Sequence, residues 1–113
     1  MTAGNVVLIA LPQTGGGTPK LRPALVLTEL PGPYQDSLLC GISTQLFALV
    51  PDWDELIKPG DADFAQSGLH RASIIRLSYL YSTEQAAIAD TIGEIASDRL
   101  ERLCSRLSSH ISP

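Results

Sequence analysis

Apolar residues along this chain fall into short runs separated by turn-forming residues, and this pattern predicts β-strands. Residues 5–11 (NVVLIAL) are a β-branched apolar run of the kind found in a strand that is buried on both faces. Residues 22–28 and 37–42 repeat the pattern, and the chain-breaking sequence PGP lies between them. Gly41, inside the third run, marks a β-bulge or a close approach of two backbones. The first half of the chain is therefore predicted to contribute three strands.

The pattern is less regular in the second half. Residues 46–62 are acidic and carry Pro and Gly, so they are predicted to hold little regular structure beyond a turn or a short strand. Residues 73–81 alternate imperfectly but are rich in β-branched and aromatic residues, which predicts a further strand. Residues 87–95 have the propensity of a helix, but their shortness, their β-branched residues and Gly93 favour a strand.

The C-terminal segment is the one clear helix. Ser97 is a good N-cap, and Asp98 places a carboxylate in the first turn, where it complements the helix dipole. One apolar stripe follows at helical spacing, formed by Leu100, Leu103, Cys104, Leu107 and Ile111. The remaining faces carry Arg99, Glu101, Arg102 and Arg106.

Short strands, turn-rich connections and one terminal amphipathic helix predict a mainly β fold, namely a small antiparallel barrel closed by a helix. With 113 residues and no long linker, residues 1–113 are expected to form a single domain. No apolar run approaches the roughly 20 residues that span a bilayer, and the N-terminus lacks a signal-like apolar core. We therefore expect a cytoplasmic protein that has no membrane contact.

Charge argues at first against a nucleic-acid partner, because 12 Asp and Glu outnumber 8 Lys and Arg and give a net charge of −4. The distribution of the charges weakens that argument. Residues 1–28 carry Lys20 and Arg22 and no acid, and residues 64–83 carry Arg71 and Arg76 and no acid. A locally positive groove on an acidic protein fits this distribution. Arg76 lies inside an apolar strand, where it either pairs with a buried carboxylate or faces such a groove.

Cysteine and histidine usage points away from metals and disulfides. Cys40 and Cys104 form no CxxC pair, and the chain has only two histidines, so neither a zinc site nor any cofactor is expected. Both cysteines are predicted to be free thiols that pack as small apolar side chains.

Five segments, in order, resemble the MazF/PemK family of toxin endoribonucleases, the toxin halves of bacterial toxin–antitoxin pairs. NVVL near the N-terminus resembles the opening GDVV strand, and LRPALVL resembles RRPALVL. GISTQ resembles PITSQ, and GLHRASIIRL resembles GLKKPSVVRL. IGEI followed by SDRL resembles the IGRLSDEDL segment that leads into the last helix. The resemblance covers nearly the whole chain.

This resemblance implies an SH3-like barrel, a homodimer, and a cognate antitoxin that covers the active groove. It implies metal-independent cleavage of single-stranded RNA by its own 2′-hydroxyl, which leaves a 2′,3′-cyclic phosphate and a 5′-hydroxyl. DNA would be contacted only through the antitoxin complex.

By position in the resemblance, Arg22 stands for the family's functional arginine and Ser43 for its functional threonine, which makes these two the predicted catalytic residues. The guanidinium fork of Arg22 matches phosphate oxygens and stays charged, and Ser43 keeps the hydroxyl. The predicted RNA-binding residues are Gln13, Thr14, Lys20, Thr44, Gln45, His70 and Arg71.

A rival interpretation is a non-catalytic binding module, either a degenerate toxin or an inhibitor of another enzyme such as gyrase. The acidic balance, Asn5 in place of the family's aspartate, and the order Ser43-Thr44 in place of Thr-Ser favour it. Thr44 and Gln45 are also typical of a polar strand end that satisfies its own backbone. Aromatic side chains such as Phe47 and Tyr79 would either stack on bases or pack in the core or a dimer interface.

Overall fold

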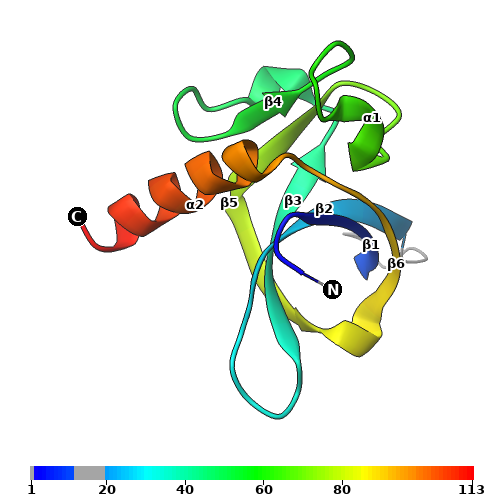
Figure 1. The fold of residues 1–113 in the computed structure, drawn as a ribbon, viewed down its shortest axis with the longest axis vertical. Coiled ribbons are helices and arrows are strands. Elements are labelled where there is room, and N and C mark those ends of the chain that lie inside the picture. Colours follow the sequence, from blue (N-terminus) through cyan, green and yellow to red (C-terminus); the bar gives the residue numbers. More distant parts are fainter. Residues whose placement is uncertain (1, 12–19) are drawn as a thin grey trace.

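A six-stranded antiparallel sheet forms the centre of the fold (Figure 1). The structure is a computed structural model that describes residues 2–11 and 20–113. The strands lie in the order β4-β5-β3-β2-β1-β6. Their bounds are Asn5–Leu11 (β1), Lys20–Glu29 (β2), Asp36–Ser43 (β3), Glu55–Ile57 (β4), Ser73–Glu84 (β5) and Ile88–Glu94 (β6). The helical segments are η1 (Leu46–Ala48), α1 (Phe64–Ser67), η2 (Gln85–Ala87) and α2 (Ser97–Ile111).

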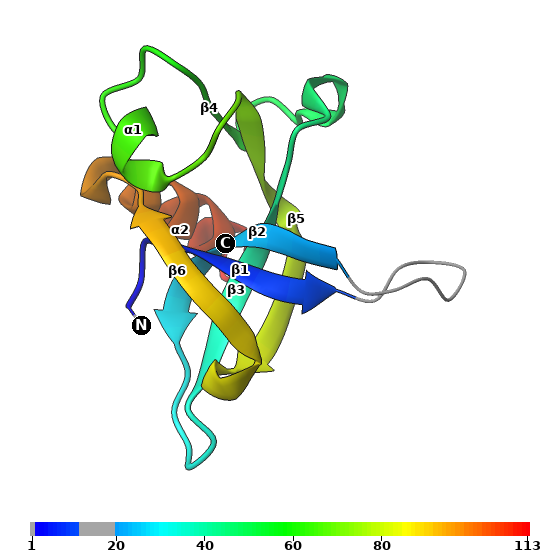
Figure 2. The ribbon, with the colours of Figure 1, turned by 90° about the vertical axis from the view of Figure 1, so that its right-hand side faces the viewer.

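The predicted mainly β fold with a C-terminal helix is confirmed, and each predicted strand is present. The sheet differs from the expected barrel in one respect: within the described residues it remains open, with β4 and β6 as its two edges. Helix α1, which the sequence did not predict, packs against the edge strand β6 (Figure 2). No helix in the described part of the chain is long and apolar enough to cross a membrane.

Two glycines permit the contact between α1 and β6. Gly68 ends α1 in the left-handed conformation at φ 77°, and a Cβ there would overlap the carbonyl oxygen of Ile92. A Cβ on Gly93 would overlap the carbonyl oxygen of Gln66 in the same way. The backbones of α1 and β6 therefore approach more closely than any residue with a side chain allows.

The middle of β1, β2 and β3 is buried on both faces of the sheet, which explains why these strands are near-continuous apolar runs. The face under α2, called here the helix face, packs a larger cluster: Val6, Leu25, Leu27, Cys40, Ile42, Ile57, Ile75, Leu77, Ile95 and Leu103. The opposite face, called here the far face, packs a smaller cluster: Val7, Ile9, Ala24, Val26 and Leu39, with Tyr81 and Ile88 against it. Successive buried residues of β1, β2 and β3 belong mainly to the two clusters alternately, because successive side chains of a strand point to opposite faces.

A bulge interrupts the pairing of β5 with β3. Cys40 pairs with Leu80 but Gly41 pairs with Arg76, so residues 77–79 of β5 lie outside the ladder. A Cβ on Gly41 would lie 3.1 Å from Cγ of Tyr79, so the ring of that bulge residue lies directly over the glycine. The sequence prediction of a bulge or close approach at Gly41 is therefore confirmed.

Residues just before β4 bind the polar groups that the bulge frees. The carboxylate of Asp54, which is 6% exposed, accepts the backbone N–H of Leu77 at 3.0 Å and that of Val50 at 2.9 Å. Trp53 Nε1 donates to the hydroxyl of Ser78 at 2.8 Å. Two of the three bulge residues, Leu77 and Ser78, are thus hydrogen-bonded to the segment before β4, which fixes the conformation of the bulge.

Helix α2 starts differently from the prediction. Ser97 is the first helical residue, and Ala96 occupies the N-cap position without a side-chain cap. The carboxylate of Asp63 takes over this role, because its Oδ2 accepts the N–H of Ala96 at 3.0 Å. The apolar stripe packs as predicted through Leu100, Leu103, Cys104 and Leu107, but Ile111 is 72% exposed. The prediction for the last turn is therefore wrong.

Both cysteines are free, as predicted. Cys40 is fully buried in the larger cluster, and this burial raises the pKa of its thiol to about 12. Cys104 is half-buried on α2, and burial raises the pKa of its thiol as well. Both are neutral packing groups at physiological pH, since the thiolate is the reactive form.

Candidate functional site

Arg22 and Ser43 stand on neighbouring strands and on the same face of the sheet. The pairing of β2 with β3 ends at Ala24 opposite Gly41. Arg22 and Ser43 each lie two residues beyond that pair on their own strands, so the alternation of side chains makes both face the same way as Ala24 and Gly41. Both side chains therefore leave the sheet on the far face, at the end of the smaller cluster. Arg22 is exposed and Ser43 is half-buried.

The hydroxyl of Ser43 shapes the turn after β3. Its Oγ accepts the backbone N–H of Gln45 at 3.1 Å, immediately before η1. This is the local backbone role that the sequence left open for Thr44 and Gln45, but Ser43 performs it. The bond uses a lone pair of the oxygen, so the hydroxyl hydrogen is available for a second partner. Thr44 and Gln45 are exposed at the end of the strand.

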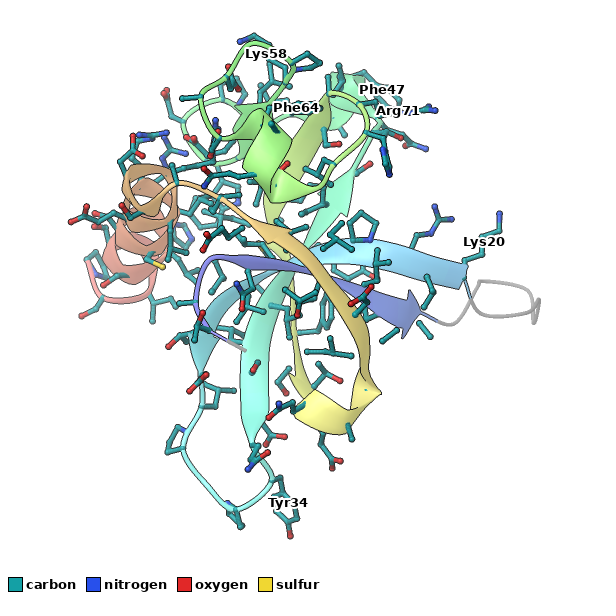
Figure 3. All side chains as sticks on the ribbon, turned by 45° about the vertical axis from the view of Figure 1, so that its right-hand side comes forward. Lys20, Tyr34, Phe47, Lys58, Phe64 and Arg71 are labelled. Atoms are coloured by element: carbon teal, nitrogen blue, oxygen red, sulfur yellow. The ribbon has the colours of Figure 1, made fainter. Side chains whose placement is uncertain are left out.

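The other predicted RNA-binding residues are dispersed. Lys20 begins β2, and His70 and Arg71 precede β5, and all three are exposed. In Figure 3, Lys20 and Arg71 lie on the right-hand side of the molecule, and α2 lies on the left. Gln13 and Thr14 lie outside the described residues.

Arg76 lies on the same face as Arg22 and Ser43. It pairs with Gly41, and its neighbours Ile75 and Leu77 pack in the larger cluster on the helix face. Among the described residues it forms no ion pair, and its Nε is buried without a hydrogen-bond partner. Of the two alternatives that the sequence left open, pairing with a buried carboxylate is therefore not what the described structure shows.

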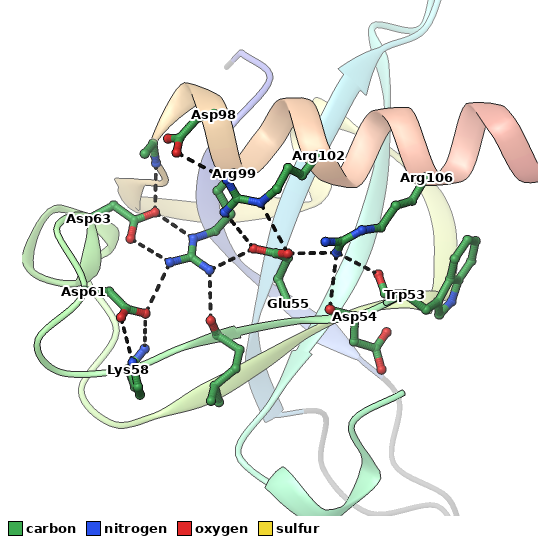
Figure 4. Close-up of polar contacts among 12 residues, drawn as sticks. Trp53, Asp54, Glu55, Lys58, Asp61, Asp63, Asp98, Arg99, Arg102 and Arg106 are labelled. Atoms are coloured by element: carbon green, nitrogen blue, oxygen red, sulfur yellow. Dashed lines mark hydrogen bonds and ion pairs between the residues drawn. The ribbon is translucent and has the colours of Figure 1, made fainter. Parts of the chain in front are cut away.

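The sequence did not predict the burial of Arg99. It lies on a face of the helix outside the apolar stripe, as expected, but it is only 8% exposed. Figure 4 shows its guanidinium among three carboxylates and one carbonyl. It donates to Asp63 through Nε at 2.8 Å and Nη2 at 3.0 Å, to Asp61 at 3.2 Å, to Glu55 at 3.1 Å and to the carbonyl of Leu56 at 2.8 Å. All five N–H donors of the side chain are thus used.

Two further arginines of α2 bind the same acidic segment. Arg102 Nη2 lies 3.0 Å from Glu55 Oε1, and Arg106 Nη1 lies 2.8 Å from Glu55 Oε2. Burial of the Glu55 carboxyl acts to raise its pKa, but hydrogen bonds from Arg102 and Arg106 outweigh this and lower it. The hydrogen bonds from Arg99 lower the pKa of Asp63. These carboxylates are therefore held in the charged form.

This network divides the cations of the chain into two groups. Of 8 Lys and Arg, those on α2 and before α1 are ion-paired: Lys58, Arg99, Arg102 and Arg106. The others, Lys20, Arg22, Arg71 and Arg76, make no ion pair with a described residue. These four come from the two acid-free segments of the sequence. The acidic segment therefore neutralises α2 and leaves the second group available to an anion.

One sequence signal could have revealed the network. Arg99 is the third residue of α2, and a cation in the first turn opposes the helix dipole. Such a residue needs carboxylates nearby, and residues 52–63 are the most acidic part of the chain. A cation in the first turn of the helix therefore indicated a contact with the acidic segment that holds Asp61 and Asp63, although both lie more than thirty residues before Arg99 in the sequence.

A hollow of about 300 Å³ lies elsewhere, at the far end of the β2–β3 hairpin, lined by Glu29, Leu30, Pro31, Gly32, Gln35, Asp36, Ser37 and Gln85. None of the predicted site residues lines it. The described residues contain no group of three or more His, Cys, Asp or Glu side chains arranged to hold a metal ion.

Residues 2–111 match the family model described as the PemK-like, MazF-like toxin of type II toxin–antitoxin systems. No curated protein matches the sequence significantly. Among solved structures, the Mycobacterium tuberculosis toxin MazF-mt6 has a TM-score of 0.68 at 16% identity, over 95% of this chain and 95% of that chain.

Two further structures share the fold. The MazE-MazF structure (Form-II) from Deinococcus radiodurans has a TM-score of 0.66 at 21% identity, over 99% of this chain and 95% of that chain. An endoribonuclease in complex with its cognate antitoxin, from a mycobacterial species, has a TM-score of 0.63 at 14% identity, over 100% and 97% of the two chains. At these identities the likeness to solved structures shows the fold.

Proposed function

We propose that this chain, which belongs to the PemK-like, MazF-like family of type II toxin–antitoxin toxins, is an endoribonuclease that cleaves single-stranded RNA without a metal ion. The observation that supports the proposal is that Arg22 and Ser43 each lie two residues beyond the last pair of the β2–β3 ladder, on the side of their strands that carries Ala24 and Gly41. The four cations that form no ion pair with described residues supply the charge that a polyanion requires.

In the proposed reaction the RNA 2′-oxygen attacks the adjacent phosphorus, and the bond from phosphorus to the 5′-oxygen breaks. The 2′-proton leaves to a base, the 5′-oxygen gains a proton, and the products are a 2′,3′-cyclic phosphate and a 5′-hydroxyl. Negative charge builds on the non-bridging phosphate oxygens during this step. The Arg22 guanidinium and the hydroxyl hydrogen of Ser43 would bind these oxygens, and such bonds accelerate a reaction when they strengthen in the transition state. Arg22 itself is no base, since it stays protonated.

The test is cleavage of a mixed-sequence RNA by the purified protein in excess EDTA, with the product ends identified. We expect cyclic-phosphate and 5′-hydroxyl ends, and no cleavage of DNA of the same sequence, which lacks the attacking hydroxyl. Arg22→Met and Ser43→Ala should each lower the rate by about 10²–10³-fold, and Ser43→Thr should retain most of it. Arg102→Met and Ser109→Ala are the matched controls, because they remove the same residue types from α2.

Two outcomes would contradict the proposal. Intact RNA across all sequences would do so, and so would cleavage that survives in folded Arg22→Met and Ser43→Ala variants. Growth arrest on expression with intact RNA would support the non-catalytic binding module.

We also propose the partners that the resemblance implies. A cognate antitoxin for this chain is favoured by the similar structure of an endoribonuclease in complex with its cognate antitoxin and by that of MazE-MazF. Contact with DNA only through the antitoxin complex is proposed from the family resemblance alone. A homodimer is supported by the exposed apolar side chains around η1, since Phe47 is 87% and Val50 47% exposed. Light scattering of the purified protein tests the dimer, and a monomer at micromolar concentration would contradict it.

A further inference from the structure

A buried carboxylate binds the bulge of β5. Asp54 is 6% exposed, and no cation among residues 2–11 and 20–113 forms an ion pair with it. Its oxygens accept backbone N–H groups instead: Oδ1 accepts that of Leu77 at 3.0 Å, and Oδ2 accepts that of Val50 at 2.9 Å. Burying a charged group away from a counterion is costly unless hydrogen bonds compensate for it. A carboxylate at this position therefore indicates a role in holding the backbone that it binds.

The two N–H groups require a carboxylate rather than an amide. Each bond ends on a different oxygen of Asp54, and an ionised Asp side chain has two acceptor oxygens and no donor. An Asn side chain would turn its NH2 group toward one of the two N–H groups, so that two donors would face each other. The N–H of Leu77 or that of Val50 would then be left unsatisfied inside the protein, which is unfavourable.

The segment that carries Asp54 is itself anchored on α2. The N–H of Asp54 donates to the carbonyl of Val50 at 2.9 Å and closes a turn. Nη1 of Arg106 donates to the carbonyl of Trp53 at 3.4 Å and to that of Asp54 at 3.3 Å. Figure 4 shows these bonds beside the ion pair of Arg106 with Glu55. The Asp54 carboxylate is therefore held in a fixed position between α2 and β5.

The bulge decides which side chains of β5 reach the far face. Residues 77–79 lie outside the ladder with β3. Because side chains of a strand alternate and three is an odd number, the bulge reverses the faces of the residues that precede it. With the bulge in place, Leu77 packs in the larger cluster on the helix face, and Arg76 lies on the far face with Arg22 and Ser43. The contact between Asp54 and the bulge therefore affects the composition of the candidate site.

We propose that Asp54 is a positioning residue for RNA: by accepting the N–H of Leu77, it holds the bulge in the conformation that directs the Arg76 guanidinium to the far face. The inference rests on the proposed ribonuclease function, in which Arg76 is one of the four cations available to the RNA strand. Asp54 is buried and acts only through β5. A negative side chain thereby increases the affinity of the protein for a polyanion.

The experiment measures binding of an uncleavable 2′-fluoro copy of an RNA that the wild-type protein cleaves. Asp54→Asn should weaken binding by about tenfold, because losing a hydrogen bond to a charged group lowers the population of the bulge conformation by about this factor. Charge alone predicts the opposite sign, since removing an acid from an acidic protein should strengthen RNA binding. The direction of the change therefore separates positioning from electrostatics.

A double-mutant cycle tests whether Asp54 acts through Arg76. Arg76→Met should weaken binding several-fold less in the Asp54→Asn protein than in the wild type, because the bulge then presents the guanidinium only part of the time. Arg22→Met should weaken binding by the same factor in both proteins, since Arg22 stands on β2, which pairs with β1 and β3 and not with β5. Loss of stability alone would not produce this difference between the two arginines.

Asp63→Asn is the matched control. Asp63 is also a buried carboxylate, at 3% exposure, and it also accepts a backbone N–H, that of Ala96 at 3.0 Å. This variant should lower the Tm without weakening RNA binding. Trp53→Phe is a milder change at the bulge, because it removes only the hydrogen bond from Nε1 to Ser78 and keeps an aromatic ring. It should weaken RNA binding by about two- to threefold, and it tests the inference even where Asp54→Asn does not fold.

Three outcomes would overturn the inference while the ribonuclease proposal stands. The first is a folded Asp54→Asn or Trp53→Phe protein that binds RNA as tightly as the wild type or more tightly. The second is a weakened Asp54→Asn protein in which Arg76→Met keeps its full effect. The third is an equal loss of binding in Asp63→Asn. A wild-type protein that cleaves no RNA would instead overturn the ribonuclease proposal.

Discussion

Replacing Arg99 with methionine tests whether the acidic segment holds α2 in place. Arg99 binds three carboxylates, and its side chain is 10% exposed, while that of Asp63 is 4% and that of Glu55 is 11% exposed. Arg99→Met would leave these carboxylates facing one another without their shared cation. Removing one partner of a buried ion pair costs about 3–5 kcal/mol of unfolding free energy. We therefore expect a loss of this size, and a fall in Tm of more than about 10 °C.

Arg102→Met is the matched control for this change. Arg102 is on the same helix and also binds Glu55, at 3.0 Å, but its side chain is 46% exposed. Exposed ion pairs contribute about 0–1 kcal/mol, so the control should cost about 1 kcal/mol or less. The difference between the two variants comes from burial, since both lose the same kind of side chain.

The assay is urea denaturation at one fixed protein concentration, because any dimerisation would make stability depend on concentration. The single tryptophan, Trp53, reports the transition, and its carbonyl accepts a hydrogen bond from Arg106 in the same network. A combined Arg99→Met and Asp63→Asn variant should recover part of the loss, since it removes one uncompensated charge. The reasoning is refuted if Arg99→Met costs no more than Arg102→Met.

Three further predictions concern stability and reactivity. Because arginine hydrogen bonds hold the pKa values of Glu55 and Asp63 below their ordinary 4.5 and 3.8, the unfolding free energy should stay level above about pH 6. The unfolding free energy should fall as the pH drops through about 4.5 toward the lower pKa values that the two carboxyls have in the folded protein. Urea titrations at a series of pH values measure this. Gly93→Ala should lower the unfolding free energy by about 1–3 kcal/mol, which is more than Gly41→Ala should lower it. The reason is that the added Cβ would meet rigid backbone at Gly93 but a tyrosine side chain at Gly41. Equal losses of unfolding free energy in the two variants would contradict this. Cys40 should react with a thiol reagent only when the protein unfolds, since its thiol is buried and has a pKa of about 12, and fast labelling of the native protein would speak against it.

Strands β1, β2 and β3 could be predicted from sequence because the middle of each is buried on both faces and is therefore a continuous apolar run. The more exposed β5 and β6 were predicted from their β-branched and aromatic residues instead. The bulge beside Gly41 could be predicted for a similar local reason, since few other features place a glycine inside such a run. Helix α2 could be predicted from its stripe. These features depend on residues that are close together in the chain.

The orientation of Arg76 could not be predicted, because it depends on the bulge in β5. Without residues 77–79 outside the ladder, the pairing of Cys40 with Leu80 would continue and place Arg76 on the helix face. The cap of α2 was mispredicted for a related reason. Its partner, Asp63, comes from a distant loop, and local capping rules consider only nearby side chains.

The division of the cations into two groups is concealed by the net charge of −4. The four cations that form no ion pair with a described residue are the groups that would attract a dissolved polyanion, while the net charge of the molecule would repel it. The rate at which such a partner associates should therefore depend strongly on the salt concentration.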